Sequence, residues 1–513
     1  MELSSGHHLE KLLTLQSDVL VLNELRTSGK TIAVCHGVFD LIHPGHIQHF
    51  SAAKKLADVL IVSITADEFV NKGPGRPLFD QNIRVATLCA LVDVDYVVIS
   101  NSPTAMQVID IIKPDFYIKG SDYSDEENDV TGMISLERQS VEKYGGKIHF
   151  TNEMTSSSSS LINRFLSSIP VNAQDWVKEF KANNGYELTV SWLDKIQHLK
   201  ILIAGETIFD QYTYCDPLAK SSKDPLLAFQ IGSTNLYPGG VLAISNNCQS
   251  WASEVSALSF IGKDANNYLD VMNMVDNRIK LNIIKTDDRP SILKHRFVDV
   301  NSESRVFEYY NFESNDLPIK ASDEIELLMD KACVNSDILI AADYGHGFFT
   351  QKIIDNLENQ RIFTAVNTQS NAGNRGYNTI SKYKKADLIC LNSGEIQLEL
   401  RDRNPDYFEI IPQMMKRMKA KYAVVTLGGE GLIAFDYLGD IAKVPAFANK
   451  VVDKVGAGDA VLAISSMLAS VGAPVKVIGF LANLIASHEV SQLGHQSSLS
   501  YSDIKKHAKA ILG

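Results

Sequence analysis

The sequence predicts an α/β protein of two successive domains, each built on a mostly parallel sheet. Three observations carry this prediction: a length of 513 residues, short apolar runs that alternate with helical patterns, and a break in that alternation near residue 169. At roughly 100 to 200 residues per domain, the chain can hold two to four packed units. We expect a first domain at 1–168, a linker at 169–197 and a second domain at 198–513.

Five strand-like runs separated by helical patterns make up the first domain. This spacing indicates βα units and therefore a parallel sheet. The serine tract Ser156–Ser160 ends the series and predicts a capped helix at Leu161–Ser168, and Ile169–Gln174 has the composition of a linker. The five runs are Thr31–Cys35, Val59–Ile64, Tyr96–Ile99, Phe116–Ile118 and Lys147–Phe150.

A second series of strand-like runs builds the second domain. Between its first strands, Tyr212–Tyr237 and Ser291–Tyr310 alternate apolar and polar residues, which predicts a small additional sheet or lid. A glycine-rich turn at Gly456–Gly458 leads into a long apolar helix. The predicted strands are Lys200–Ala204, Ser256–Ile261, Ile338–Ala341, Ile362–Val366, Leu388–Leu391 and Tyr422–Thr426.

Composition narrows the possible partners. The 49 basic and 61 acidic residues give a net charge of −12 without a long basic run, so we expect no nucleic-acid partner. No apolar stretch approaches the roughly 18 residues that cross a bilayer, and Met1–Lys11 lacks the pattern of a secretory leader. We therefore expect a cytoplasmic protein with no membrane partner. The six cysteines lack a Cys-x-x-Cys pair, which favours reduced, buried thiols.

The segment Cys35–His46 is the strongest motif of the first domain. It places a glycine-bearing turn after a strand and the sequence His-x-Gly-His at the start of a helix. A helix start offers unpaired N–H groups and a positive dipole end, and the imidazoles of His43 and His46 can donate to phosphate charge. Two histidines at this spacing could also bind a metal. The coincidence of strand, glycines and helix start favours phosphate chemistry.

These residues resemble the signature of the nucleotidyltransferase superfamily, which includes the cytidylyltransferases. The resemblance covers about residues 30 to 166 and is greatest to the adenylyltransferase half of the ADP-heptose synthase family. It implies a Rossmann-like fold. Further matches are Lys54-Lys55, Lys72–Pro77, Arg84, Tyr117–Tyr123 and Thr155–Ser158.

The chemistry expected of this site is the attack of a phosphomonoester oxygen on the α-phosphorus of a nucleoside triphosphate. His43, His46 and Lys55 would stabilise the added charge while pyrophosphate leaves. Lys72, Arg76 and Arg84 are expected to bind the substrate, and the alternative for each is solvated surface charge. Nucleotide or phosphate contacts are expected from Gly37, Phe39, Gly45, Lys119, Gly120, Asp122, Thr155, Ser156 and Ser157.

The segment Val451–Ala460 is the strongest motif of the second domain. Its small residues let successive N–H groups converge on a transferring phosphoryl group at a helix start. Asp459 is placed where it could take a proton from a hydroxyl. The alternative is that Asp459 only caps the helix.

This motif resembles the C-terminal signature of PfkB/ribokinase-type sugar kinases, over about residues 198 to 512. The resemblance implies a ribokinase-like α/β fold with a small β lid and ATP-dependent phosphorylation of a sugar. Supporting segments are Gly205–Asp210, Pro238–Gly240, Asp343–Gly345, Asn392–Glu395 and Thr426–Gly431. It implies sugar contacts from Asp210, Gly239 and Gly240, phosphate contacts from Thr426, Gly428, Gly456, Ala457 and Gly458, and Mg²⁺ bound through water by Asn392 and Glu395.

The second domain departs from this pattern at three places. Lys454 stands where the family commonly has Thr, and Glu206 replaces an Asp of the opening turn. Asn367-Thr368-Gln369 stands where heptose kinases usually carry Asp-Pro-Lys. The heptose enzymes also place the kinase first, whereas this chain places the transferase first.

Together the two resemblances imply a bifunctional enzyme of nucleotide-activated sugar synthesis, and we expect it to form a homo-oligomer, a dimer. It would use Mg²⁺ and ATP or another nucleoside triphosphate, transfer a nucleotidyl group to a sugar phosphate and phosphorylate a heptose-like sugar or sugar phosphate. The alternative is a cytidylyltransferase for a polyol phosphate, with the ribokinase-like domain as a non-catalytic regulatory module.

Overall fold

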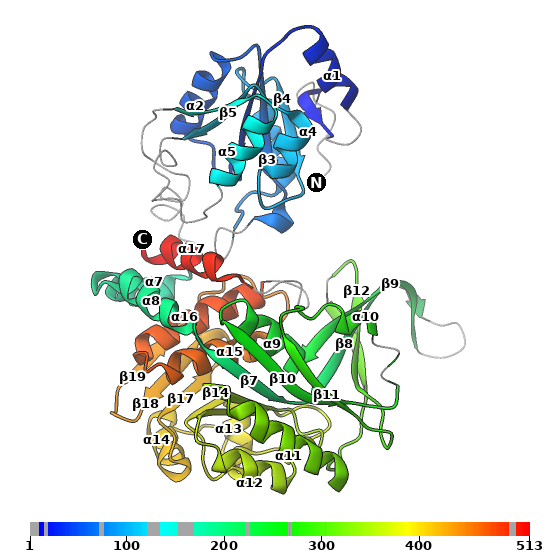
Figure 1. Cartoon of the computed structure of the whole chain (residues 1–513), viewed down its shortest axis with the longest axis vertical. Coiled ribbons are helices and arrows are strands. Elements are labelled where there is room, and N and C mark those ends of the chain that lie inside the picture. Colours follow the sequence, from blue (N-terminus) through cyan, green and yellow to red (C-terminus); the bar gives the residue numbers. More distant parts are fainter. Residues whose placement is uncertain are drawn as a thin grey trace. The chain divides into compact units, whose positions relative to one another are not determined.

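The computed structural model describes residues 10–14, 19–70, 76–120, 134–151, 169–220, 226–264, 266, 269–302, 304–491 and 499–513. The chain divides into two compact units, Met1–Ser168 and Ile169–Gly513, each built on a sheet of its own (Figure 1). Within the described ranges, every helix is too short or too polar to span a membrane.

A six-stranded parallel sheet in the order β1-β4-β3-β2-β5-β6 forms the centre of the first unit. The five predicted strands are confirmed, and β1 adds a two-residue edge strand that is too short to show a pattern. The strands are β1 (Leu12–Leu13), β2 (Ile32–Gly37), β3 (Val59–Thr65), β4 (Tyr96–Ser100), β5 (Phe116–Gly120) and β6 (Lys147–Thr151).

Both faces of this sheet are buried, which explains the nearly continuous apolar runs of its strands. Strand β2 sends Ile32 and Val34 into one core and Ala33 and Cys35 into the other. Helices α1, α4 and α5 contribute to the first core, and α2 and α3 contribute to the second. The helices are α1 (Val19–Thr27), α2 (Pro44–Lys54), α3 (Gln81–Cys89), α4 (Met106–Ile112) and α5 (Ile134–Lys143), with a 3₁₀ turn at η2 (Asp67–Phe69).

The strand order fixes where a ligand can bind. From β2 the chain proceeds to β3 and β4 on one side, and it later continues as β5 and β6 on the other. The direction of winding therefore reverses between β2 and β5. In open parallel sheets, ligands bind at such a reversal, outside the carboxyl ends of the strands.

The second unit is built on a nine-stranded sheet in the order β11-β10-β7-β14-β15-β16-β17-β18-β19, whose last two pairings are antiparallel. All six predicted strands are present, and β11, β18 and β19 were not predicted. The strands are β7 (Lys200–Gly205), β10 (Glu254–Ile261), β11 (Lys280–Lys285), β14 (Ile338–Asp343), β15 (Phe363–Thr368), β16 (Leu388–Asn392), β17 (Tyr422–Thr426), β18 (Leu432–Asp436) and β19 (Ile441–Val444). Here the winding reverses between β7 and β14.

Helices cover both faces of this sheet (Figure 1). On one face lie α9 (Val241–Gln249), α15 (Ala457–Ser470) and α16 (Val475–Glu489). On the other lie α11 (Ile319–Cys333), α12 (Gln351–Asn359), α13 (Ser393–Leu400) and α14 (Tyr407–Met418). Shorter pieces are α10 (Leu269–Met272), η6 (Ile380–Lys382) and η7 (Gly428–Glu430). Helix α15 is buried along nearly its whole length, so it needs no polar face.

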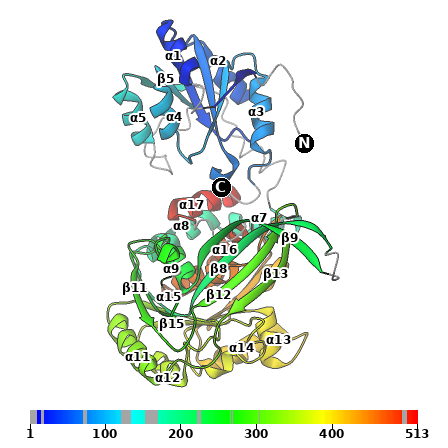
Figure 2. The same ribbon diagram turned by 90° about the vertical axis from the view of Figure 1, so that its right-hand side faces the viewer.

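The predicted small sheet is present as a four-stranded sheet in the order β13-β12-β8-β9. It forms a separate layer of the second unit (Figure 2). Strand β8 (Thr207–Lys220) begins directly after β7 and pairs with β9 (Leu227–Gly240) and β12 (Ile292–Asp299), and β12 pairs with β13 (Ser304–Asn311). The six cysteines of the chain are all buried, as predicted.

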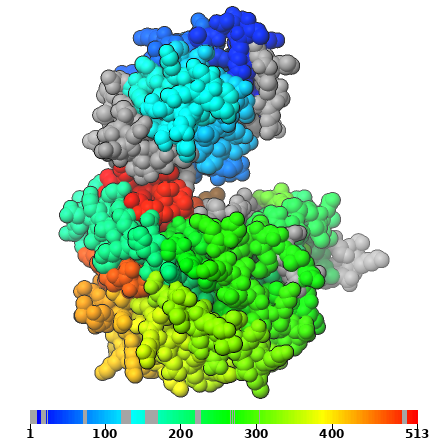
Figure 3. All heavy atoms as spheres, viewed as in Figure 1, coloured from blue at the N-terminus to red at the C-terminus, as the bar shows by residue number. Residues whose placement is uncertain are grey.

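The segment 169–197, expected to be a linker, contains two helices. These are α7 (Val171–Ala182) and α8 (Gly185–Ile196), and their apolar residues Ala173, Val177 and Phe180 belong to the core of the second unit. They pack against α17 (Tyr501–Leu512), and the three helices adjoin on the surface (Figure 3). The linker expectation was wrong because the helical spacing of these apolar residues outweighs the Pro and Asn near 170.

Candidate active sites

The N-terminus of α2 carries both histidines of the first predicted site. His43 caps the helix, and its Nδ1 accepts a hydrogen bond of 3.2 Å from the backbone N–H of Gly45. The ring centres of His43 and His46 are 3.9 Å apart. Two imidazoles thus lie together at the positive end of a helix, at the edge of the sheet where ligands bind.

The turn between β2 and α2 is tightly packed. Phe39 adopts a left-handed conformation (φ 50°), and its ring lies edge-on to His46 with the centres 5.3 Å apart. A Cβ added to Gly37 would lie 3.1 Å from Cζ of Phe39. Glycine at this position therefore lets the phenyl ring support the imidazole.

Arg76, expected to bind substrate, forms a buried ion pair of 2.9 Å with Asp40. Asp40 also accepts backbone N–H bonds from Leu78 at 2.7 Å and Phe79 at 3.1 Å. These bonds tie the segment from Arg76 to Phe79 to the turn that carries the histidines. Asp40 was not predicted as a site residue, although its position three residues before His43 was a signal.

Arg84 was also expected to bind substrate, and its position corrects that expectation. Its side chain is 1% exposed. Its nitrogens donate to the backbone carbonyls of Phe79 at 3.0 Å, Val38 at 2.6 Å and Thr65 at 2.9 Å. Arg84 therefore holds the loops of the site together and does not face a substrate.

The structure does not bring Lys55 to the histidines. Lys55 follows the last residue of α2 and is exposed, whereas His43 and His46 lie at the start of the helix. Nine residues at about 1.5 Å each separate Lys55 from His46 by about 14 Å along the axis. The expectation for Lys55 was wrong because residues close in sequence lie at opposite ends of this helix.

The end of β5 brings a cation to the same edge of the sheet. Lys119 forms an ion pair of 2.9 Å with Glu137, and Gly120 is the last residue of the strand. His49 contacts Thr151 at the end of β6, with 2.8 Å between Nδ1 and Oγ1. His49 and Glu137 were not predicted as site residues; the spacing of three between His43, His46 and His49 was the available signal. Lys72, Asp122, Thr155, Ser156 and Ser157 lie outside the described residues.

Asp459 lies in the first turn of α15. Gly456 precedes the helix in a left-handed conformation (φ 86°), and no side chain caps the helix start. Oδ1 of Asp459 accepts a hydrogen bond of 2.9 Å from the phenol of Tyr344. A Cβ added to Gly458 would meet no atom within 4 Å. Gly458 thus leaves open space beside the helix start.

Glu206, the departure in the opening turn, is fully buried between β7 and β14. Its carboxylate accepts backbone N–H bonds from Tyr344 at 3.0 Å, His346 at 3.0 Å and Phe348 at 3.3 Å. Burial and the neighbouring carboxylate of Asp343 raise the pKa of Glu206 to about 7. Glu206 therefore shapes the loop after β14, next to the place where the winding reverses.

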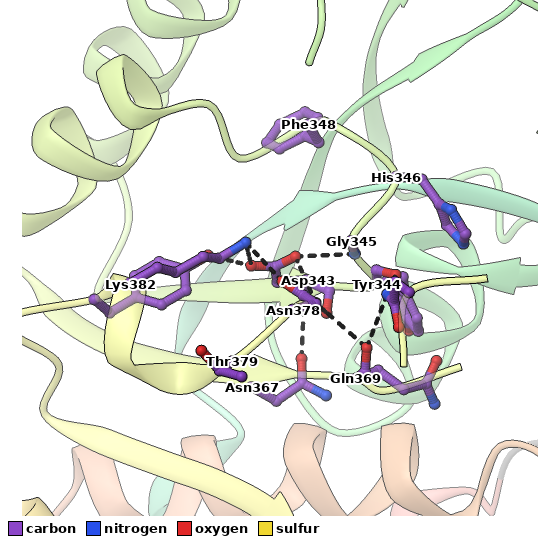
Figure 4. A network of polar contacts seen from close by, with 12 residues as sticks. Asp343, Tyr344, Gly345, His346, Phe348, Asn367, Gln369, Asn378, Thr379 and Lys382 are labelled. Carbon is purple, nitrogen blue, oxygen red and sulfur yellow. Dashed lines mark hydrogen bonds and ion pairs between the residues drawn. The ribbon is translucent and has the colours of Figure 1, made fainter. Parts of the chain in front are cut away.

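A polar network surrounds Asp343 at the end of β14 (Figure 4). Its carboxylate accepts bonds from the phenol of Tyr383 at 2.7 Å and from Asn378 at 3.2 Å, and it pairs with Lys382 at 2.5 Å. Asn367 accepts a bond of 3.2 Å from the backbone N–H of Asp343. Asn367, another departure from the family pattern, thus supports the strand end.

Asp210 of β8 lies against Gly239, one of the two glycines that end β9. Asp210 is 6% exposed and forms an ion pair with Arg296 of β12. A Cβ added to Gly239 would lie 2.2 Å from Oδ2 of Asp210. Gly240 adopts a left-handed conformation (φ 58°) and precedes α9. Only glycine therefore allows β9 to pass this carboxylate.

Asn392 and Glu395 form a reciprocal cap at the start of α13. The side chain of Asn392 accepts from the backbone N–H of Glu395 at 2.9 Å, and Glu395 accepts from that of Asn392 at 2.8 Å. Glu395 also accepts a bond of 3.2 Å from the N–H of Ser370. Burial raises the pKa of Glu395 to about 7, and the charge of Asp459 adds to the rise.

The remaining predicted residues lie at the ends of neighbouring elements. Thr426 ends β17, and Gly428 has a left-handed conformation (φ 61°) with no atom within 4 Å of an added Cβ. Lys454 is exposed in the loop before α15. The neighbouring Asp453 is buried and accepts bonds from the N–H of Val455 at 2.9 Å and the phenol of Tyr212 at 3.2 Å.

Lys294 on β12 is a site residue that was not predicted from the sequence. Its side chain is 7% exposed, and Nζ lies 5.6 Å from the ring centre of Tyr344. Burial lowers the pKa of Lys294, and the charges of Asp210, Asp459 and Glu206 oppose this shift. An isolated lysine inside an alternating strand gives no signal until the fold shows which face it lies on.

Both sites are helix starts at the carboxyl edge of a wound α/β sheet, which is the geometry of phosphate-binding α/β proteins. The pfkB family of carbohydrate kinases matches residues 199–501, and a cytidylyltransferase-like family matches residues 34–165. The chain belongs to the pfkB family of carbohydrate kinases and carries a cytidylyltransferase-like domain before the kinase domain.

Two relatives, each called bifunctional protein HldE, match a shorter stretch. The chain is 36% identical over 149 residues to the bifunctional protein HldE of Syntrophotalea carbinolica, which is 28% of this chain and 29% of that protein. It is 37% identical over 138 residues to HldE of Hahella chejuensis, 26% of this chain and 28% of that protein. Both alignments thus span less than a third of the relatives' length.

A solved structure supports the fold of the second unit. Phosphofructokinase-2 from Escherichia coli, in complex with potassium, aligns with a TM-score of 0.50 and 16% identity. The alignment covers 61% of this chain and 99% of that chain. At this identity the similarity concerns the fold alone.

Proposed function

We propose that the chain is a bifunctional enzyme of nucleotide-activated sugar synthesis. Its first unit transfers a nucleotidyl group from ATP to a sugar phosphate, and its second unit phosphorylates a heptose-like sugar or sugar phosphate with ATP. The observation that carries the proposal is the presence, in one chain, of two helix starts with different reactive groups: the pair His43 and His46 on α2, and Asp459 on α15. Each lies in a unit that matches the corresponding enzyme family.

The first reaction needs charge stabilisation and no covalent nucleophile. An oxygen of the sugar phosphate attacks the α-phosphorus of ATP, the bond to the β-phosphate breaks, and pyrophosphate leaves. The N–H groups at the start of α2 and the imidazoles of His43 and His46 donate to the oxygens on which charge develops. Arg76 and Arg84 hold the surrounding loops through their buried contacts.

The second reaction needs a base. A sugar hydroxyl attacks the γ-phosphorus of ATP, its proton passes to the carboxylate of Asp459, and ADP leaves. The glycine-capped start of α15 offers N–H groups to the transferring phosphoryl group. Asp210 and the backbone at Gly239 and Gly240 would bind the sugar.

Magnesium is part of the same proposal. Protein sites usually hold Mg²⁺ through one or two carboxylates, several waters and the substrate phosphates. Asn392 and Glu395 fit such a site through water, because each of their oxygens keeps an acceptor lone pair beside its backbone bond. When bound, the ion would neutralise charge on the nucleotide phosphates. A homodimer is also proposed, and light scattering of the purified chain tests it.

A product screen tests the function. Sugar phosphates and free sugars, with heptoses among them, are crossed with the four nucleoside triphosphates, and products are read by mass spectrometry. The proposal predicts a nucleotide sugar with pyrophosphate and, separately, a sugar-dependent formation of ADP. His46→Ala should reduce only the first product and Asp459→Asn only the second, each by at least about 10²-fold. A polyol-phosphate product made with CTP, together with ATP binding but no phosphorylation, would instead favour a cytidylyltransferase with a regulatory second domain.

A further inference from the structure

The phenol of Tyr344 contacts the carboxylate of Asp459. The distance from Oη to Oδ1 is 2.9 Å, and the two side chains are 2% and 8% exposed. Tyr344 directly follows β14, whereas Asp459 lies on α15, so the bond joins two elements that are far apart in the sequence. Burial and the charge of Asp459 raise the pKa of Tyr344 above its ordinary value. The phenol therefore keeps its proton at neutral pH and acts as the donor.

The backbone of Tyr344 is held on both sides. Its N–H donates to Glu206 at 3.0 Å. Its carbonyl accepts bonds from Asn374 at 2.7 Å and from Asn371 at 2.9 Å. The close-up view shows Tyr344 beside the network of Asp343, on a loop that these contacts fix (Figure 4). A buried ring on such a backbone has little freedom to turn its hydroxyl elsewhere.

A fixed donor to one carboxylate oxygen also directs the other. The terminal torsion of an aspartate is broad, so an unrestrained carboxylate samples many orientations. The two oxygens share one plane, and a bond to Oδ1 from a rigid phenol therefore sets the direction of Oδ2. A base that is misdirected by about 1 Å can lose about 10²-fold in rate.

The other charged or titratable groups near Asp459 come from separate elements. Lys294 on β12 and Glu395 on α13 act on it through charge, and Cys390 on β16 is a further titratable neighbour. Lys294 also lies over the ring of Tyr344, with Nζ 5.6 Å from its centre. Tyr344 thus contacts the carboxylate through its hydroxyl and a buried lysine through its ring.

We propose that Tyr344 is a positioning residue of the kinase reaction, which orients the carboxylate of Asp459 toward the acceptor hydroxyl. The inference rests on the proposed kinase function of the second unit. It assigns no contact between Tyr344 and substrate, and Tyr344 acts only through Asp459.

The test is Tyr344→Phe in the full-length chain, measured as sugar-dependent ADP formation. We expect kcat to fall by about 10- to 100-fold and KM for ATP and sugar to stay within about twofold, since substrate contacts remain. The matched control is Tyr501→Phe on α17, which removes a phenol that donates to Asp194 of α8 and leaves Asp459 untouched. That control should keep kcat within about threefold.

A double-mutant cycle separates positioning from general damage. In an Asp459→Asn background, Tyr344→Phe should change the residual rate by less than about twofold, because the group it orients is already gone. A loss of equal size in both backgrounds would overturn the proposal. An unchanged kcat in the single variant would overturn it as well.

Folding and function are checked in the same samples. If tryptophan fluorescence shows that Tyr344→Phe is unfolded, Asn374→Ala replaces it. This change removes a hydrogen bond to the backbone of Tyr344 and keeps the phenol group. An unchanged kcat in that variant would overturn the proposal. A wild-type chain that forms no ADP with any sugar would overturn the kinase function and this inference together. An active wild type with an equally active Tyr344→Phe would overturn this inference alone.

Discussion

The N-termini of α2 and α15 have similar positions in their sheets but carry different reactive groups. Both are helix N-termini at the carboxyl edge of a parallel sheet, but α2 is capped by the side chain of His43, whereas α15 follows Gly456 with no side-chain cap. The first site adds imidazole donors, which suits a reaction that only redistributes charge. The second adds a carboxylate, which suits an acceptor hydroxyl that must lose a proton.

The two sites also differ in how they are supported. In the first unit, Arg76 and Arg84 hold the loops around the histidines through buried guanidinium groups. In the second unit, Glu206 and Asp343 hold the loop after β14 through buried carboxylates. The donors therefore differ: buried guanidinium groups donate to loop carbonyls around the imidazoles, whereas loop N–H groups donate to buried carboxylates near Asp459.

The largest effect should come from Asp459→Asn. The amide is nearly isosteric with the carboxylate but is a poor base, so phosphoryl transfer should fall by roughly 10²- to 10⁴-fold while ATP binding is kept. The measurement is sugar-dependent ADP formation together with an ATP titration. Nucleotidyl transfer by the same protein is the internal control. Wild-type kinase turnover in the variant would show that Asp459 is not the base.

Glu206→Ala should destabilise the second unit by about 3 kcal/mol, because three backbone N–H groups would lose their acceptor inside the core. Urea unfolding followed by tryptophan fluorescence measures this unit alone, since Trp176, Trp192 and Trp251 all lie in it. The matched control is Asp436→Ala, which removes an acceptor from two exposed backbone N–H groups. It should cost less than about 1 kcal/mol.

The stability difference between wild type and Glu206→Ala should also depend on pH. The pKa of Glu206 is raised to about 7 from an ordinary value of 4.5, so the folded state holds the proton more tightly than the unfolded state. Its contribution to stability is full below about pH 4.5 and is lost as the pH rises through about 7. The gap in unfolding free energy between wild type and Glu206→Ala should therefore narrow between about pH 5 and about pH 8. A gap that widens would mean that the three N–H donors lower the pKa more than burial raises it.

In the first unit, His46→Ala should reduce nucleotidyl transfer by at least about 10²-fold, the scale for losing one preorganised donor to developing charge. Folding should be little changed, because His43 and not His46 caps α2. The assay is pyrophosphate release. Lys55→Ala, at the exposed far end of the same helix, is the matched control and should keep activity within about twofold. Equal losses of nucleotidyl transfer in both variants would show that Lys55 belongs to the site.

The smallest effect should follow from separating the units. Fragments 1–168 and 169–513 should each fold and keep their activity within about twofold, because each has its own sheet and site. A fragment 198–513 is the contrast, since it lacks α7 and α8 and would expose the core surface that Val177, Phe180 and Leu193 cover. It should be insoluble or unfold at lower urea. Equal behaviour of both long fragments would mean that these helices add nothing to the second unit.

The sequence by itself determined the features that are local along the chain. A strand, a glycine-bearing turn and a helix start follow one another within Cys35–His46, and a glycine turn precedes an apolar helix at Gly456–Gly458. In each case the reactive residue belongs to the element that positions it. The alternation of apolar runs fixed the strands for a similar reason, since buried parallel strands are apolar on both faces.

Tertiary structure alone decided which distant groups meet. The bond between Tyr344 and Asp459 joins residues 115 positions apart, and the pair of Arg76 and Asp40 spans 36. These contacts depend on strand order and on the loops that each strand end brings together, which no local pattern contains. The same reason explains the error at Lys55, because His46 and Lys55 lie at opposite ends of one helix. The fold, in contrast, brings Lys294 of the small sheet to Tyr344 in the loop after β14.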